Sequence, residues 1–578
     1  MLTKKLTGYP SIDKPWLKYY SEEALNAKLP ACTIYDYLYE SNKDYRGRTA
    51  LNYFGRKITY GELFENIEKA ARALKQNGVG KGSIVTVLMP TLPETVYLFY
   101  ALGKIGAIGN MVDPRTSAEG IRDYIQEVGS ELLIAVDVVL PKTADILSKT
   151  TIKKVLVIST ADSLPPVLRT LYKMKQGKRP RVYDACISWK SFIAEEAAYT
   201  GTTSAGYEKN RPVVIVHTGG TTGHPKGVLL TNDNLNISAY QCIISGLDFQ
   251  RKHTWLNIMP PFIAYGVGNG LHLPLIVGME VILIPQFDPN KFDELLLKHK
   301  PNHMTGVPSH YGNIINSQTL KNKDLSYLIA PIVGGDSMNI DLERQTNQFF
   351  KKHNAKCHVV KGYGMTEVSA AVSVCATDSC NQIGSVGIPF THTVISIFDV
   401  ENGEELMYNQ QGEVCITGPN TMLGYYKNPK ATAEIIVRHK DGLDWVHSGD
   451  IGYMTEDGML FIVDRIKRMI VRHDGFKVFP SMIEKTIASH EAVQSCCVVG
   501  IPDKEHSQGK LPAVHVVLAP AFSGQEDAVR QQLAVLCQKE LPEYAQPVDY
   551  VLRDSLPLTS IGKVDYRALE EKGSKNIE

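Results

Sequence analysis

Composition alone points to no particular partner for this chain of 578 residues. Lys and Arg number 62 and Asp and Glu number 61, which gives a formal net charge of +1 at pH 7. A balanced charge creates no global field for an anionic polymer, so we expect no nucleic-acid partner. Any ligand must therefore be recognised at a local site.

Cysteines at metal-ligand or redox spacing and long apolar runs are also lacking. The ten cysteines are scattered, and the adjacent Cys496 and Cys497 have neither metal-ligand nor redox spacing, so reduced thiols in a cytoplasm are the plain interpretation. Residues 1–8 lack the apolar run of a signal peptide. The most apolar stretch, residues 271–285, is shorter than the roughly 20 residues of a membrane span. We expect a soluble, cytoplasmic protein that at most touches a membrane surface.

The order of apolar patterns predicts an α/β fold. Runs of β-branched residues at 83–89 and 155–159 alternate with helical patterns such as 93–105, which favours layers built on largely parallel sheets. Residues 211–217 form a buried-strand candidate that ends in a Gly/Thr-rich loop, and a helix is expected from Asn232 onward.

The pattern also predicts two domains. Strand patterns at 413–426 and 459–461, which contain or follow glycines, indicate a β-rich subdomain before residue 464. We expect a large domain of residues 1–463, a small α+β domain of residues 464–578 and a hinge at about 464–467. The expected elements of the small domain are strands at 468–472, 495–500 and 513–518, a turn at 474–475, and helices at 481–489 and 526–539.

Residues 165–181 are strongly basic, with apolar residues interleaved. Two interpretations stay open. The segment is either a solvated surface helix and loop or a contact with a membrane surface.

The strongest local signal for chemistry is the segment TGGTTGHPKG at 218–227. Its glycines let backbone N–H groups turn toward an anion, its threonines supply hydroxyl groups, and Lys226 supplies positive charge. It is not a Walker A loop, because Lys226 follows Pro225 and no Ser or Thr comes after it. We predict a phosphate-binding loop. Its expected ligand-binding residues are Thr218, Gly219, Gly220, Thr221, Thr222, Gly223 and Lys226.

This loop resembles the phosphate loop of the acyl-adenylate-forming superfamily, which includes acyl-CoA synthetases, nonribosomal-peptide adenylation domains and firefly luciferases. The other signatures of that superfamily follow in the expected order between about residue 48 and residue 569. The resemblance implies ATP, Mg²⁺ and coenzyme A as cofactors, and a carboxylic acid as substrate.

Residues 362–367, GYGMTE, resemble the superfamily motif that binds adenine, the α-phosphate and magnesium. By this resemblance Tyr363 and Gly364 lie at adenine, Thr366 contacts phosphate, and Glu367 holds magnesium with Thr222. The chemistry agrees, because a flat π-face suits a purine and a carboxylate is a hard oxygen ligand.

Residues 333–338 resemble the opposite wall of the adenine slot, which assigns Gly335 and Asp336 to the nucleotide. Asp336 departs from the small apolar residue that the superfamily often has there.

Three later segments complete the resemblance. Residues 445–450 resemble the segment whose aspartate, here Asp450, binds both ribose hydroxyls, a task for an acceptor-only group. Residues 464–467 resemble the hinge, where Arg465 contacts ribose and phosphate and Lys467 is the pivot. Residues 557–565 resemble the C-terminal loop with the catalytic lysine, here Lys563.

The implied mechanism needs positive charge, because a carboxylate attacking the α-phosphate of ATP is one anion approaching another. A thiolate must then reach the carbonyl that Lys563 covers. The resemblance implies that the small domain rotates about Lys467 and presents Gly475, which leaves room for the pantetheine arm. The expected catalytic residues are Lys226, Thr366, Glu367 and Lys563.

Three functions compete: an acyl-CoA ligase, an adenylating enzyme that loads a carrier protein, and a non-catalytic binding relative. The presence of Lys226, Glu367 and Lys563 disfavours the last. Ile263 disfavours amino acids, because peptide-synthetase relatives place an aspartate there for the α-ammonium group. It also departs from the histidine of many acyl- and aryl-CoA ligases.

The surroundings of Ile263 predict a largely apolar pocket, which favours a fatty or other hydrophobic acid over acetate. The same side chains could equally be general core. The expected pocket residues are Phe262, Ile263, Tyr265, Gly266, Val267, Gly334, Val368 and Val372.

Overall fold

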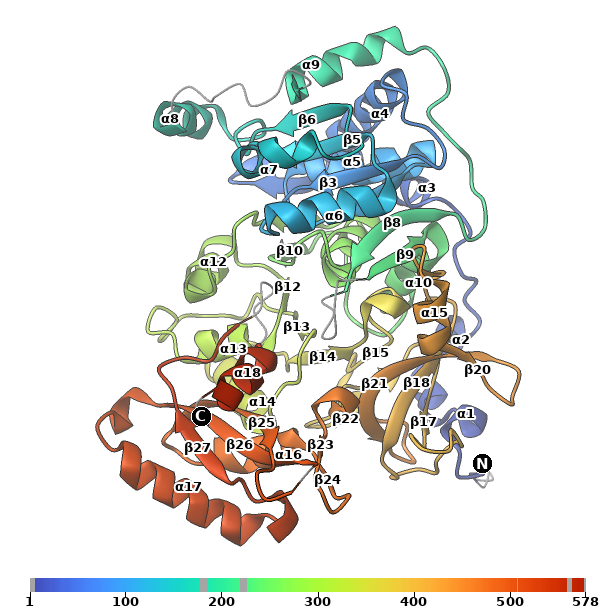
Figure 1. Cartoon of the computed structure of the whole chain (residues 1–578). Coiled ribbons are helices and arrows are strands. Elements are labelled where there is room, and N and C mark those ends of the chain that lie inside the picture. The colour runs from blue at the N-terminus through green and yellow to red at the C-terminus, as the bar shows by residue number, and fades with distance from the viewer. Residues whose placement is uncertain (1–5, 177–185, 219–225, 507, 559–563, 576–578) are drawn as a thin grey trace.

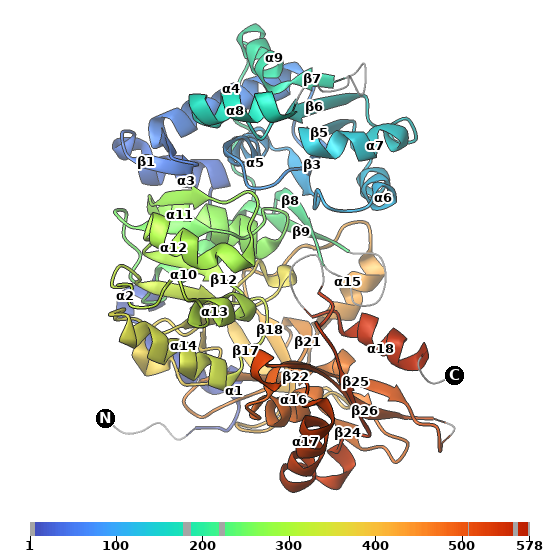
Figure 2. The same ribbon diagram turned by 90° about the vertical axis from the view of Figure 1, so that its left-hand side faces the viewer.

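The computed structural model describes residues 6–176, 186–218, 226–506, 508–558 and 564–575. It has the predicted mixed α/β fold, with a large N-terminal domain of layered sheets and a smaller C-terminal domain below it (Figures 1 and 2).

Two helices begin at the residues that the sequence predicts. Helix α5 (Pro93–Ile105) has proline in its first turn and ends at Gly106, whose φ of 75° lies in the left-handed region. Helix α10 (Asn232–Ile243) is capped by the side chain of Thr231. Both signals are local, which explains why sequence alone locates these helices.

An eight-stranded sheet forms the upper layer of the molecule, in the order β19-β9-β8-β4-β3-β5-β6-β7 (Figure 1). The strands from β8 to β7 are parallel, and β9 and β19 add an antiparallel edge. The strands are β3 (Ile84–Leu88), β4 (Ile108–Met111), β5 (Leu132–Val136), β6 (Lys154–Ile158), β7 (Cys186–Ser188), β8 (Pro212–His217), β9 (Gly227–Thr231) and β19 (Gly424–Tyr425).

A nine-stranded sheet forms the second layer, in the order β16-β15-β14-β13-β12-β10-β11-β1-β2. Its central strands, from β14 to β1, are parallel, with antiparallel pairs at both ends. The strands are β1 (Thr49–Tyr53), β2 (Arg56–Thr59), β10 (Thr254–Asn257), β11 (Glu280–Leu283), β12 (His303–Gly306), β13 (Ala330–Val333), β14 (Val360–Tyr363), β15 (Ser373–Val374) and β16 (Ile388–Pro389).

An antiparallel five-stranded sheet forms the β-rich subdomain that the sequence predicts. Its strands are β17 (Val394–Phe398), β18 (Gly412–Thr417), β20 (Ile436–Arg438), β21 (Asp444–Met454) and β22 (Leu460–Arg465).

Helices cover these layers. Helices α4 and α5 pack together, α5 also contacts β4 and β8, and α13 packs on α14. The helices are α1 (Pro10–Asp13), α2 (Glu22–Leu25), α3 (Ile34–Asn42), α4 (Tyr60–Gln76), α6 (Ala118–Val128), α7 (Leu140–Leu147), α8 (Pro166–Gln176), α9 (Trp189–Ala194), α11 (Leu273–Val277), α12 (Phe292–His299), α13 (Pro308–Ile315), α14 (Ile340–Lys352) and α15 (Pro429–Ile435). Among the described residues, no helix combines the length and apolar character that crossing a membrane requires.

The smaller domain has a hydrophobic core of its own, which includes Ile470, Ile483 and Leu533. Helix α16 packs on both β25 and α17. The elements are β23 (Ile470–Val471), β24 (Lys477–Val478), β25 (Val493–Pro502), β26 (Lys510–Leu518), β27 (Asp549–Leu552), α16 (Pro480–Ala488), α17 (Glu526–Glu540) and α18 (Tyr566–Lys575).

The predicted strand at 468–472 is wrong at its start. Ile466–Arg468 form a short 3₁₀ turn, and β23 covers only Ile470–Val471. The Arg468 guanidinium pairs with Glu484 and Asp464, which draws this residue out of the strand.

Candidate active site

A cavity of 3540 Å³ extends between the sheets and reaches the small domain. It lies where strands end: Thr218 follows β8, Gly334 follows β13, and Tyr363 ends β14. Ligands of α/β proteins bind at such carboxyl ends. The cavity is therefore the candidate active site.

The predicted phosphate loop connects two paired strands. His217 at the end of β8 pairs with Gly227 at the start of β9, and the Thr218 amide donates to the Lys226 carbonyl over 3.0 Å. Thr218 and Lys226 both line the cavity. The other predicted loop residues, Gly219, Gly220, Thr221, Thr222 and Gly223, lie outside the described residues.

Lys226 and Glu367 meet at a tyrosine. The Lys226 ammonium lies 4.8 Å from the centre of the Tyr425 ring, and the Tyr425 hydroxyl donates to Glu367 Oε1 over 2.7 Å. Glu367 is only 6% exposed, and burial raises the pKa of its carboxyl, against the opposing effects of Tyr425, Arg465 and Lys226. Positive charge would keep this carboxylate ionised. Thr366 precedes it and also lines the cavity.

Glycines let backbone segments approach closely around the predicted adenine slot. A Cβ on Gly364 would lie 1.6 Å from the Ala370 carbonyl oxygen, and Gly335 has a φ of +79°. Asp336 is exposed beside Gly335, and its Oδ1 accepts a hydrogen bond from the Ser337 amide. Gly335, Asp336 and Gly364 all line the cavity, so the two segments expected at adenine border one cavity.

Tyr363, Asp450 and Arg465, which the sequence assigns to the nucleotide, are in contact with one another. The Tyr363 hydroxyl donates to Asp450 Oδ2 over 2.7 Å, and Arg465 Nε lies 2.9 Å from Asp450 Oδ1. Asp450 is 4% exposed. Its register partner across β21 and β22 is Arg465, so the sheet itself holds the pair together.

The residues predicted as hinge pivot and as coenzyme A contact differ in their relation to the cavity. Lys467 lines the cavity, whereas Gly475 does not and lies in the exposed turn between β23 and β24 with a φ of +83°. Lys563 lies outside the described residues. Its neighbours Leu558 and Val564 form a β-bridge with each other and line the cavity.

Half of the predicted acid pocket faces the cavity. Phe262, Ile263, Tyr265 and Gly334 line it. Val267, Val368 and Val372 do not, because each is fully buried in a hydrophobic core. Gly266 is also absent from the lining, and a Cβ there would lie 1.7 Å from the Pro260 carbonyl oxygen, so it serves close packing. For these four residues the core interpretation holds.

Comparison with known proteins shows the family of this chain. The family model described as AMP-binding enzyme matches residues 38–426. The chain belongs to this family. The model of the AMP-binding enzyme C-terminal domain matches residues 482–563.

Relatives of this AMP-binding enzyme align along most of its length. The long-chain-fatty-acid–CoA ligase of Bacillus subtilis (strain 168) is 29% identical over 569 residues, which cover 97% of this chain and 99% of that protein. The probable 4-coumarate–CoA ligase 1 of Dictyostelium discoideum is 31% identical over 486 residues, 84% of this chain and 83% of that one. The crystal structure of an anthranilate CoA ligase in complex with anthranoyl-AMP has a TM-score of 0.81 at 20% identity and covers 95% of this chain and 98% of its own, which shows the shared fold.

Tyr425 and Glu413 were not predicted from the sequence, yet both contact residues of the candidate site or their neighbours. Tyr425 contacts Glu367 and Lys226 from an edge strand, and Glu413 at the start of β18 accepts a hydrogen bond from the Gly449 amide, next to Asp450. The glycine-punctuated strand pattern at 413–426 contains both residues, but it carries no signal of their distant partners.

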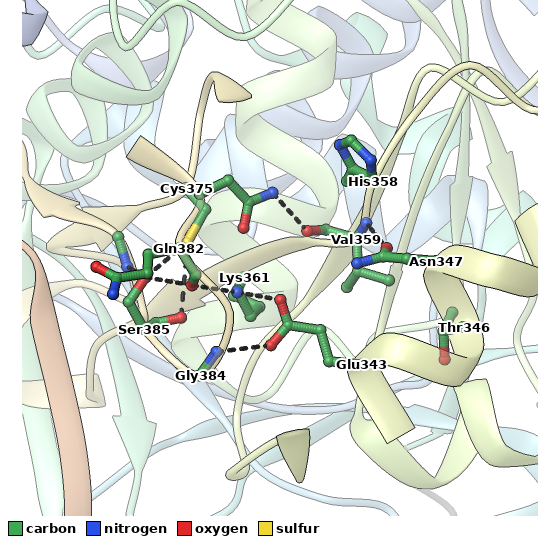
Figure 3. A network of polar contacts seen from close by, with 12 residues as sticks. Glu343, Thr346, Asn347, His358, Val359, Lys361, Cys375, Gln382, Gly384 and Ser385 are labelled. Carbon is green, nitrogen blue, oxygen red and sulfur yellow. Dashed lines mark hydrogen bonds and ion pairs between the residues drawn. The ribbon is translucent and has the colours of Figure 1, made fainter. Parts of the chain in front are cut away.

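A further missed group is the buried network shown in Figure 3. Lys361 immediately precedes the adenine segment; its ammonium pairs with Glu343 of α14 and donates to the Gln382 carbonyl over 2.9 Å. Glu343 also accepts from the Gly384 amide over 2.9 Å. The Lys361 and Glu343 side chains are 4% and 1% exposed. The network joins β14, α14 and the loop around Gly384 beside Tyr363.

Proposed function

We propose that this AMP-binding enzyme joins a carboxylic acid to coenzyme A in two steps. In the first, a carboxylate oxygen of the acid attacks the α-phosphorus of ATP, which forms the acyl-adenylate and releases pyrophosphate. In the second, the sulfur of coenzyme A attacks the acyl carbonyl, the thioester forms, AMP leaves, and the thiol proton is released. The CoA ligase names of relatives that align over most of this chain support the proposal.

One observation carries it: two charged groups border a single cavity. Lys226, Tyr425 and Glu367 form one, suited to phosphates, and Tyr363, Asp450 and Arg465 form the other, suited to adenosine. Glu367, with Thr222, is assigned to Mg²⁺, because a buried carboxylate is a ligand of the hard type that this ion prefers. When bound, Mg²⁺ neutralises phosphate charge, while Lys226 and Lys563 bind the outer and reacting oxygens.

We assign the acid to the fatty or other hydrophobic class. Phe262 and Ile263 line the cavity beside the adenine segments, and apolar residues continue its lining toward α8. These residues include Val138, Leu164, Leu168, Leu171 and Tyr172. An apolar extension of this kind buries a hydrocarbon chain, which gains about 0.8 kcal/mol per CH₂.

A panel of acids tests the activity and the substrate class together. Acetate, hexanoate, palmitate and 4-coumarate are incubated with ATP, Mg²⁺ and either coenzyme A or a carrier protein, and thioester, AMP and pyrophosphate are measured. We expect thioester on coenzyme A with equal amounts of AMP and pyrophosphate, and higher kcat/KM for palmitate than for acetate. Product on the carrier protein alone, or a preference for acetate, contradicts the respective assignment.

We further propose that residues 1–463 and 464–578 move as two bodies about Lys467. The separate core of the small domain supports this division. The positions of the two functional segments support the movement, because the neighbours of Lys563 border the cavity while Gly475 does not. Rotation exchanges them between the two steps.

We also propose that α8 contacts an anionic membrane surface. Val167, Leu171 and Met174 are 72%, 58% and 77% exposed, and α8 lies at the outer edge of the upper layer in Figure 1. Leu171 also lines the cavity, so the contact would place this part of the cavity beside a lipid supply. Residues 177–181 of the basic segment lie outside the described residues.

Liposome co-sedimentation tests this contact. The parent should bind anionic vesicles at low salt and less at high salt, because screening shortens electrostatic reach to about 8 Å at physiological ionic strength. Glutamine at Lys173, Lys175, Lys178, Arg179 and Arg181 should abolish binding, whereas glutamine at the exposed Lys351, Lys352 and Lys356 should not. A parent that stays in solution with anionic vesicles at low salt contradicts the contact.

A further inference from the structure

The loop that presents Asp450 is a bulge in the antiparallel pair of β18 and β21. Glu413 pairs with Ile451 and Cys415 pairs with His447, so Val414 alone faces Ser448, Gly449 and Asp450. Gly449 has a φ of +70°, in the left-handed region. A bulge of this kind leaves the ladder and can re-aim a side chain, here toward the cavity that Asp450 lines.

One side chain contacts the bulge at its middle residue, Gly449, and at the residue that precedes it, His447. Glu413 Oε1 accepts from the Gly449 amide over 2.9 Å, and Glu413 Oε2 lies 2.7 Å from His447 Nδ1. The Glu413 and His447 side chains are only 13% and 22% exposed. His447 Nε2 in turn lies 2.9 Å from His439 Nε2, so the ring is held on both sides. The geometry of the bulge therefore depends on Glu413.

We propose that Glu413 is a positioning residue for ribose recognition: it fixes the bulge so that Asp450 points at the ribose hydroxyls of ATP. This inference rests on the proposed function, in which Asp450 binds the ribose. Without Glu413, the Gly449 amide loses its acceptor and the left-handed turn loses its restraint. Asp450 then remains in the chain but is no longer held in one direction.

Discrimination between ATP and 2′-deoxy-ATP tests the inference, because a merely structural role would not alter it. Acid-dependent pyrophosphate exchange is measured with both nucleotides. In the parent, ATP should have the higher kcat/KM. Asp450→Ala should remove this preference and raise the KM for ATP by about tenfold to a hundredfold, as for loss of hydrogen bonds to a charged group.

Glu413→Ala should raise the KM for ATP by about tenfold and reduce the same preference, with kcat close to that of the parent, because Asp450 is misdirected rather than absent. Glu413→Gln keeps an acceptor oxygen for the Gly449 amide and should restore most of the preference. Glu405 serves as the matched control. Glu405 lies between β17 and β18 and accepts hydrogen bonds from Ser11 of α1 and Ser396 of β17. Glu405→Ala should therefore lower stability but leave the preference for ATP over 2′-deoxy-ATP intact.

The results separate the inference from the proposed function. If Asp450→Ala loses the preference and Glu413→Ala keeps it, the positioning role is overturned and the ribose assignment stands. If Asp450→Ala also keeps it, the ribose assignment itself fails. Should Glu413→Ala not fold, Gly449→Ala strains the same left-handed turn without touching the carboxylate, and an unchanged preference in that variant overturns the inference.

Discussion

At the scale of single residues, the protonation state of the Glu367 carboxyl depends on its neighbours. Burial raises the pKa of this carboxyl, and the Tyr425 hydroxyl and the Lys226 ammonium oppose that rise. A protonated carboxyl is a poor ligand for Mg²⁺. If Glu367 binds Mg²⁺ as proposed, the groups that keep its carboxylate ionised set the pH range over which the metal binds.

Removing the Tyr425 hydroxyl should weaken this control. Tyr425→Phe keeps the ring beneath Lys226 but removes a donor to ionised Glu367, so the pKa of Glu367 should rise further. We expect the Mg²⁺ concentration for half-maximal pyrophosphate exchange to increase about tenfold, most strongly toward low pH. The neighbouring Tyr426→Phe, whose ring contacts Lys427, is the control. Identical Mg²⁺ dependence in both variants from about pH 6 to about pH 8 contradicts the role.

Residues that occur in compact motifs could be named from the sequence as candidates for the site. Tyr363, Asp450 and Arg465 each lie in such a motif, and the structure brings them into contact. Tyr425 and Glu413 could not be found in this way, because their partners are Glu367 and Gly449, which lie 58 and 36 residues away. The sequence could not distinguish the core residue Val368 from a pocket residue, because an apolar side chain fits a pocket and a core equally well.

At the scale of elements, local signals predicted what local contacts determine. Helix α5 (Pro93–Ile105) begins with a proline and is followed directly by Gly106, so both of its end signals are local. Both ends match the prediction. Arg468 is the opposite case, since its pairing with Glu484 of α16 converts an expected strand start into a turn. Contacts that distort an element come from other elements and leave no trace in its own sequence.

The Lys361–Glu343 pair connects β14 to α14, and breaking one side of it should destabilise the fold. Lys361→Met leaves Glu343 buried without its cation, which typically costs about 3 to 5 kcal/mol of the free energy of unfolding. The double variant Lys361→Met/Glu343→Leu removes both charges and should regain most of this loss. Urea unfolding of the three proteins measures it. A double variant no more stable than the single one contradicts the pairing.

Helix α5 also contains a carboxyl that should give the fold a pH dependence. Glu94 is 2% exposed, and burial raises its pKa to about 7, against the opposing hydrogen bond from Ser163. A raised pKa means that the stabilising neutral form is complete below the unfolded value of about 4.5 and is lost as pH rises through about 7, which amounts to about 3 kcal/mol.

Glu94→Gln should remove this dependence. The variant should become progressively more stable than the parent from about pH 5 to about pH 8 in urea unfolding, because an amide does not ionise. The exposed Glu119→Gln should differ from the parent little and to the same extent at each pH. Parallel pH profiles for the parent and Glu94→Gln contradict the burial of a neutral carboxyl.

At the scale of the whole molecule, the two functional ends of the small domain face different neighbours. Val564, beside Lys563, borders the cavity, whereas Lys477, beside Gly475, pairs with Glu401 of the β-rich subdomain over 2.6 Å. In this arrangement of the domains the segment of Val564 borders the cavity and Gly475 does not, which is why the proposed mechanism requires a movement between its two steps.

Separate assays of the two steps should reveal this division. Lys563→Ala should abolish acid-dependent pyrophosphate exchange, because the reacting oxygens lose their cation, at a cost of about 100-fold or more in rate. Given synthetic acyl-adenylate and coenzyme A, the same variant should still form thioester at nearly the parental rate. Lys504→Ala, also in the small domain, is the control for both steps. Equal loss of the two steps in Lys563→Ala contradicts the assignment.

The ion pair between Asp450 and Arg465 has a consequence for how nucleotide and domain movement influence one another. Asp450 belongs to β21, and Arg465 is the residue at which β22 enters the proposed hinge. If the ribose hydroxyls and the Arg465 guanidinium share one carboxylate, nucleotide occupancy and hinge position form a single linked equilibrium with a common coupling free energy. If a change of hinge position alters the affinity for ATP by some factor, bound ATP must alter the equilibrium between the hinge positions by the same factor. Measuring nucleotide affinity would then report the position of the small domain before any bond is made or broken.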